Sequence, residues 1–144
     1  MSLTAERLIP AKFLGITGQI LICIIIAITR QDNILTSVAD DITEDDTEYK
    51  SADTQILSAL SLTMLCVAFE GAILLFGVSL FYDRINAVQI FLHILGIIFY
   101  SWYVLDMWSY EHIWTLWIFF ALVPAGLEIG LLVSVCTLYK SKFS

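Results

Sequence analysis

The sequence predicts an all-α membrane protein in which four transmembrane helices form an up-down antiparallel bundle. Three observations lead to this fold class. Of the 144 residues, 59% are hydrophobic and only 15% are charged. The apolar residues gather in four long runs, and most acids and bases lie between the runs. The runs are unbroken rather than alternating, which favours membrane-spanning helices over the strands of a β-barrel.

The first predicted span covers about residues 13–29 and follows a basic segment with Arg7 and Lys12. Pro10 suits the first turn of a helix, where its missing N–H is not needed. The segment after the run, Ala-Ile-Thr-Arg-Gln-Asp, is a poor site for signal-peptide cleavage. We therefore expect the run to remain as a membrane anchor.

The connection between the first two spans, residues 30–55, is long and strongly acidic. An EF-hand needs a turn glycine, and this segment contains none, so a calcium site is not favoured. We expect a solvated loop, with an acidic surface for a basic partner as the alternative. The acids are Asp32, Asp40, Asp41, Glu44, Asp45, Asp46, Glu48 and Asp53.

The other three spans are predicted at about residues 56–81, 85–105 and 113–138. Because their connections are short, consecutive spans should be antiparallel neighbours. The spans leave no room for a separate soluble domain, so residues 1–144 are expected to form a single membrane domain.

The distribution of basic residues predicts the orientation of the bundle. The side that holds both termini has five bases, and the opposite side has two, Arg30 and Lys50. The positive-inside rule then places both termini in the cytosol and the acidic loop on the other side. The five bases are Arg7, Lys12, Arg84, Lys140 and Lys142.

A few polar residues interrupt the apolar runs. Helical rise places Glu70, His93 and Glu128 roughly 14–18 Å from the cytosolic ends of their spans, at similar depth. Ionised groups at that depth are costly, so they are expected to face the bundle interior, protonated or paired with protonated His93. The pattern predicts a buried polar layer of Glu70, His93 and Glu128, with Gln19 near it.

Two interpretations of this polar layer stay open. In the first, hydrogen bonds between the spans hold the helices in register. In the second, the two acids and the histidine form a proton or cation path, and the chain is a small proton-coupled transporter or channel. The first interpretation is preferred, because a pump also needs a water-filled cavity.

The fourth span carries two further features. Gly126 and Gly130 form a Gly-x-x-x-Gly pair, which permits close approach of another helix, and internal packing is the default expectation. Pro124 frees the carbonyl of Phe120 from its helical hydrogen bond, so a kink is expected before Glu128.

Several classes of function are not indicated. The sequence shows no catalytic grouping, phosphate loop or metal-ligand spacing, so neither an enzyme nor a cofactor is expected. Its three cysteines fall inside predicted spans and include no Cys-x-x-Cys pair. A net charge of −7 argues against a nucleic-acid surface and leaves membrane lipids and other proteins as partners.

Two stretches resemble the transmembrane protein 107 family, tetraspan proteins of the ciliary transition zone. ALSLTMLCVAFEGAILLFGVSLF, residues 59–81, has the family's Ala-Leu-Ser start, mid-span glutamate and Gly-Val-Ser-x-Phe ending. LVPAGLEIGLLVSVCTLYKSKF, residues 122–143, has its Pro-Ala, its glutamate and a basic ending with phenylalanine. His93 and the segment Lys12, Phe13 and Leu14 also correspond to family positions.

The resemblance implies a non-enzymatic scaffold in the transition-zone membrane. It would support assembly of the Meckel syndrome module, cilium biogenesis and the gating of ciliary membrane composition. The implied partners are other transition-zone membrane proteins, such as tectonics and meckelin-like receptors, and B9-domain proteins. The C-terminal KSKFS resembles a dilysine retrieval signal, but basic anchoring at the membrane surface is the preferred interpretation.

Overall fold

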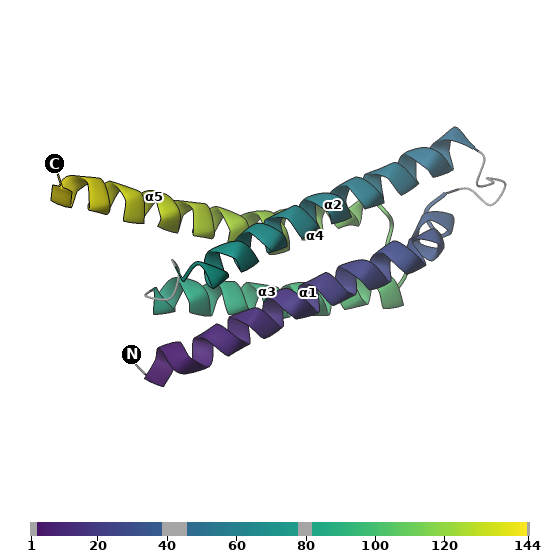
Figure 1. The fold of residues 1–144 in the computed structure, drawn as a ribbon. Helices are drawn as coiled ribbons and strands as arrows, with labels where there is room; N and C mark the ends of the chain where they lie inside the picture. The colour runs from purple at the N-terminus through teal and green to yellow at the C-terminus, as the bar shows by residue number, and fades with distance from the viewer. Residues whose placement is uncertain (1–2, 39–45, 78–81, 144) are drawn as a thin grey trace.

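The computed structural model describes residues 3–38, 46–77 and 82–143, and these residues form helices joined by turns (Figure 1). Within these described residues, four helical rods are long and apolar enough to cross a membrane, so the predicted fold class is confirmed. The elements are α1 (Leu3–Leu35), α2 (Thr47–Leu75), α3 (Asp83–Leu105), α4 (His112–Trp117), the π-helical turn η2 (Ile118–Leu122) and α5 (Val123–Phe143).

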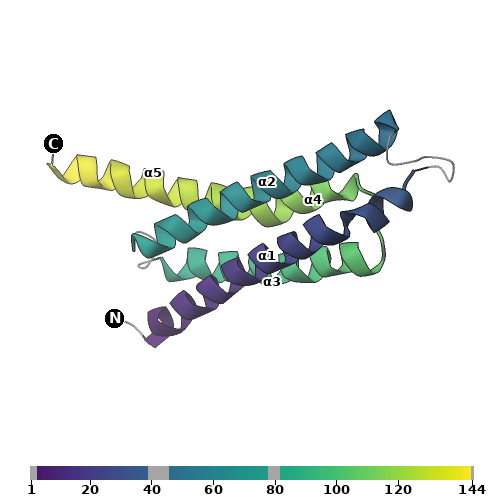
Figure 2. The same ribbon diagram turned by 45° about the vertical axis from the view of Figure 1, so that its right-hand side comes forward.

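The rods run alternately up and down, and the last three elements form one continuous rod. Figures 1 and 2 show the start of α1 and the end of α5 at the same end of the bundle, with the end of α1, the start of α2 and the α3–α4 connection at the other end. The location of the termini in the cytosol stays a prediction.

The predicted boundaries of the first connection are wrong, because helix continues into it from both sides. α1 runs to Leu35 and α2 begins at Thr47, so much of the segment 30–55 is helical. No glycine or proline occurs in this segment, and nothing in the sequence stops either helix earlier. Asp40, Asp41, Glu44 and Asp45 lie outside the described residues.

The second span ends earlier than predicted, at Leu75 instead of residue 81. Gly77 has a positive φ of 75°, and its N–H donates to the carbonyl of Leu74. Glycine adopts this backbone conformation without strain and commonly ends a helix. Residues 78–81 lie outside the described part of the chain.

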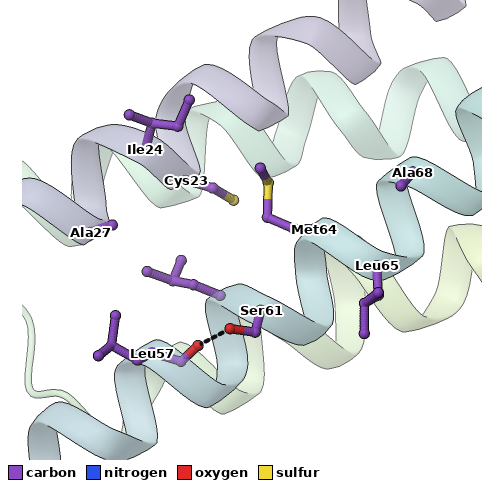
Figure 3. Close-up of a pocket in the computed structure, with 9 residues that line it drawn as sticks. Cys23, Ile24, Ala27, Leu57, Ser61, Met64, Leu65 and Ala68 are labelled. Carbon is purple, nitrogen blue, oxygen red and sulfur yellow. Dashed lines mark hydrogen bonds between the residues drawn. The ribbon is translucent and has the colours of Figure 1, made fainter.

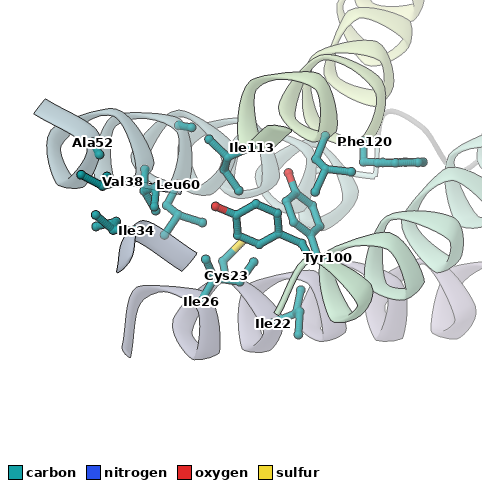
Figure 4. Close-up of a cluster of buried hydrophobic side chains, with 14 residues drawn as sticks. Ile22, Cys23, Ile26, Ile34, Val38, Ala52, Leu60, Tyr100, Ile113 and Phe120 are labelled. Atoms are coloured by element: carbon teal, nitrogen blue, oxygen red, sulfur yellow. The ribbon is translucent and has the colours of Figure 1, made fainter. Parts of the chain in front are cut away.

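The half of the bundle near the α1–α2 connection has an apolar core to which all four rods contribute (Figure 4). Ile26, Ile56, Tyr100 and Ile113 come from different rods, and each is almost completely buried. Asn33 fixes α1 against the end of α3 by donating to the carbonyls of Tyr103 (2.8 Å) and Trp108 (2.9 Å). The half nearer the termini holds most of the buried polar side chains and a smaller apolar cluster of Ile16, Val67 and Leu74.

Close helix packing depends on glycines other than the predicted pair. A Cβ atom on Gly15 of α1 would lie 3.1 Å from His93 Cβ, and one on Gly96 of α3 would lie 3.0 Å from Phe120 Cβ. These glycines let α1 approach α3, and α3 approach the fourth rod. Gly126 and Gly130 are instead exposed, with no described atom within 4 Å of a Cβ placed there, so they do not make the expected internal contacts.

Gly96→Leu is expected to destabilise the bundle, and Gly126→Leu is its matched control. A side chain at Gly96 would push against Phe120 and Gln19, and overpacking of this kind costs about 1–3 kcal/mol. The exposed Gly126 should accept leucine with a change within about 0.5 kcal/mol. The free energy of unfolding of the purified chain in mixed micelles, followed by circular dichroism, measures both effects. Equal losses in the two variants would contradict the assigned packing.

Candidate functional site

α3 supplies the central polar stripe of the bundle. Asn86, Gln89 and His93 are buried and are spaced three and four residues apart, which places them on one helix face. The same face continues with Gly96, Tyr100 and Tyr103 toward the other end of the helix. The polar side chains therefore point into the bundle, where the other rods meet α3.

His93 is the centre of the first group of contacts, here called the His93 cluster. Its Nε2 lies 2.9 Å from Glu70 Oε2 on α2, and its Nδ1 lies 2.6 Å from Gln19 Oε1 on α1. Gln19 Nε2 donates to the carbonyl of Phe120 on the fourth rod at 2.7 Å. One chain of hydrogen bonds therefore joins all four rods, and its three side chains have no exposed surface.

The hydrogen-bond directions in the His93 cluster determine which ring nitrogen is the donor. Because Gln19 donates through Nε2, its Oε1 must accept, so His93 Nδ1 carries a hydrogen. The remaining contact, between His93 Nε2 and Glu70 Oε2, holds one proton between two basic atoms. Wherever that proton lies, the pair is neutral overall, which suits a buried position.

The carbonyl of Phe120, which Pro124 leaves without its helical donor, is an acceptor in the His93 cluster. Pro124 has no N–H, so the carbonyl of Phe120, four residues earlier, receives no regular helical hydrogen bond from it. Gln19 supplies the missing donor. The fourth rod departs from regular α-helical geometry at the π-helical turn Ile118–Leu122, which ends two residues before Pro124.

A second group of contacts, here called the Lys12 cluster, lies nearer the termini. Lys12 Nζ is 3.1 Å from Glu128 Oε2 and 3.1 Å from Asn86 Oδ1. Gln89 Nε2 donates to the same Glu128 oxygen at 2.6 Å and to the carbonyl of Pro124 at 3.1 Å. The side chains of Lys12 and Glu128 are 1% and 0% exposed, so this is a buried ion pair between the first and fourth rods.

The structure thus divides the predicted polar layer into two clusters. Glu70, His93 and Gln19 are brought together, whereas Glu128 contacts Gln89, about one helical turn away along α3. Sequence reasoning missed Lys12, which it treated as a base at the membrane surface. Helix α1 begins at Leu3, and Lys12 therefore lies more than two turns inside it.

The two clusters connect the helices through buried side chains. Glu70, His93 and Glu128 are each 0% exposed. The described residues include no group of three His, Cys, Asp or Glu side chains that could hold a metal ion. Each cluster pairs one acid with one base, which removes net charge from the interior.

The part of this chain that matches a known protein family includes the residues of both clusters. The profile of the transmembrane protein family TMEM107 matches residues 8–132. Transmembrane protein 107 of Danio rerio is 34% identical over 132 residues, which cover 90% of this chain and 94% of the relative. The Homo sapiens protein of the same name is 29% identical over 136 residues, 94% of this chain and 96% of the relative. No solved structure shows a significant match.

Proposed function

The chain belongs to the transmembrane protein 107 family, and on this premise we propose that it is a non-enzymatic membrane scaffold of the ciliary transition zone. In this proposal it supports assembly of the Meckel syndrome module, cilium biogenesis and the gating of ciliary membrane composition. Its partners are other transition-zone membrane proteins and B9-domain proteins.

One structural observation supports the scaffold over the transporter or channel. The acids and the histidine that would carry protons are fully buried in neutral, hydrogen-bonded pairs that connect the rods. A transported proton or cation would need water to reach these groups. The outer surface of the rods is instead rich in exposed apolar side chains, which suits contacts with lipids and with other membrane helices.

Glu70→Gln distinguishes the two functions. A glutamine at this position can still donate to His93 Nε2, so the bundle and the localisation of a scaffold should be preserved. A proton-coupled transporter would lose its coupling. The experiment expresses the tagged full chain in ciliated cells that lack the native protein and scores its position and the fraction of cells with cilia.

The expected result is confinement to the ciliary base for the native chain and for Glu70→Gln, with equal recovery of cilia. Glu48→Gln, at an exposed position on the same helix, is the control for the loss of an acid. Uniform staining of the plasma membrane by the native chain would refute the scaffold. Proton flux into vesicles that contain the native chain, absent for Glu70→Gln, would support the transporter instead.

A further inference from the structure

A groove of about 670 Å³ lies between α1 and α2 on the outer surface of the bundle. Cys23, Ile24 and Ala27 line it from α1, and residues between Leu57 and Ala68 line it from α2 (Figure 3). The lining is almost entirely apolar, and the hydroxyl of Ser61 is already used as a donor to the carbonyl of Leu57. The groove therefore offers an apolar ligand a surface within the two spans.

The groove leads toward a charged pocket between the same two helices. This second pocket has a volume of about 350 Å³, and its lining includes Arg30, Lys50 and Asp53. Arg30 and Asp53 form an ion pair whose side chains are 34% and 25% exposed. Asp53 precedes Leu57 by four residues, about one helical turn, so the charged pocket and the apolar groove are adjacent along α2.

Length and charge together indicate the class of ligand. From Leu57 to Ala68 the groove extends roughly 16 Å, about half of the ~30 Å hydrocarbon core, which is the depth of one leaflet. An acyl chain fits this depth, and a phosphate group fits the two cations beyond it. A sterol hydroxyl is too small for the charged pocket, and an apolar helix would bring no polar group to it.

We propose that the groove between α1 and α2 binds a zwitterionic glycerophospholipid from the leaflet nearer the α1–α2 connection. One acyl chain lies in the apolar groove, the phosphate faces Arg30 and Lys50, and the ammonium group faces Asp53. The proposal depends on the membrane location of the chain and is independent of the proposed ciliary function.

Lipid retention by the purified full chain tests this site. The chain is stripped of lipid in detergent and titrated separately with palmitoyl-oleoyl phosphatidylcholine, with the diacylglycerol of the same chains, and with cholesterol. Native mass spectrometry then counts the molecules retained. We expect one phosphatidylcholine to be retained, with diacylglycerol and cholesterol at least about tenfold weaker.

Ser61→Phe and Ser58→Phe form a matched pair for the groove. Both serines are exposed on α2 and donate to the carbonyl four residues earlier at 2.7 Å, but only Ser61 lines the groove. Ser61→Phe should lower phosphatidylcholine retention about tenfold or more, and Ser58→Phe should not. Ala68→Phe blocks the other end of the groove and serves as a second variant if Ser61→Phe does not fold.

Three outcomes would overturn the proposal. Equal retention by Ser61→Phe or Ala68→Phe and the native chain would show that the bound lipid lies elsewhere. Equal retention of diacylglycerol would remove the need for the headgroup contacts. Preferential retention of cholesterol would assign the groove to a sterol.

Discussion

Replacing Lys12 by alanine is expected to be among the most damaging single changes in the chain, lowering the free energy of unfolding by about 3–5 kcal/mol. The change leaves the buried carboxyl of Glu128 without its cation and leaves Asn86 without the ammonium donor. Without Lys12, Glu128 is buried either as an unpaired carboxylate or as a protonated acid without its partner. Both forms lower the stability of the folded protein. Unfolding in mixed micelles, followed by circular dichroism, measures the loss.

A double variant separates the charge effect from lost packing. Lys12→Met with Glu128→Leu replaces both members of the ion pair by apolar side chains of similar size, and we expect it to be clearly more stable than Lys12→Ala alone. Lys140→Ala removes an exposed lysine and should change stability by less than about 0.5 kcal/mol. If Lys12→Ala were no worse than Lys140→Ala, the buried ion pair would not exist in the folded protein.

The sequence predicts the four rods because composition and run length constrain membrane helices strongly. Helix ends were predicted less well, and particular residues explain this. Gly77 was a visible stop signal for α2 that the apolar run of residues 56–81 obscured. The acidity of segment 30–55 favours a loop, yet the segment contains no glycine or proline, and α1 and α2 extend into it from both ends.

The partners of the buried polar groups were harder to predict than their burial. Depth estimates identified Glu70, His93 and Glu128, but depth alone does not determine the rotation of each helix about its axis. Asn86 and Gln89 were not predicted, although they repeat with His93 at helical spacing, which is a signal of a shared buried face. Lys12 carried a weaker one, since a single lysine after an apolar turn also fits a membrane surface.

The sequence also did not predict which glycines lie at the helix contacts. Gly126 and Gly130 match a known helix-contact pattern, whereas Gly15 and Gly96 belong to no recognised motif. The structure uses the latter two, because they lie opposite His93 and Phe120. A spacing motif shows that close approach is permitted, and only the neighbouring helix determines whether it occurs.

His93→Leu is expected to have the second large effect, a loss of about 3 kcal/mol or more. It removes the partner of Glu70 Oε2 and of Gln19 Oε1 at once, and both atoms are buried. Glu70→Gln should cost much less, because its amide can still donate to the histidine. The same unfolding measurement in mixed micelles compares the variants. We expect the free energy of unfolding of His93→Leu to be far lower than that of Glu70→Gln.

His112→Leu is the matched control, since His112 is the other histidine of the chain and is exposed at the start of α4. It should leave the free energy of unfolding nearly unchanged. The hydrogen-bond chain further predicts that Gln19→Leu resembles His93→Leu in its cost, because it leaves the Phe120 carbonyl and His93 Nδ1 without partners. A small loss for Gln19→Leu beside a large one for His93→Leu would show that the histidine acts through Glu70 alone, and the link from α1 to the fourth rod would then contribute little to the stability of the bundle.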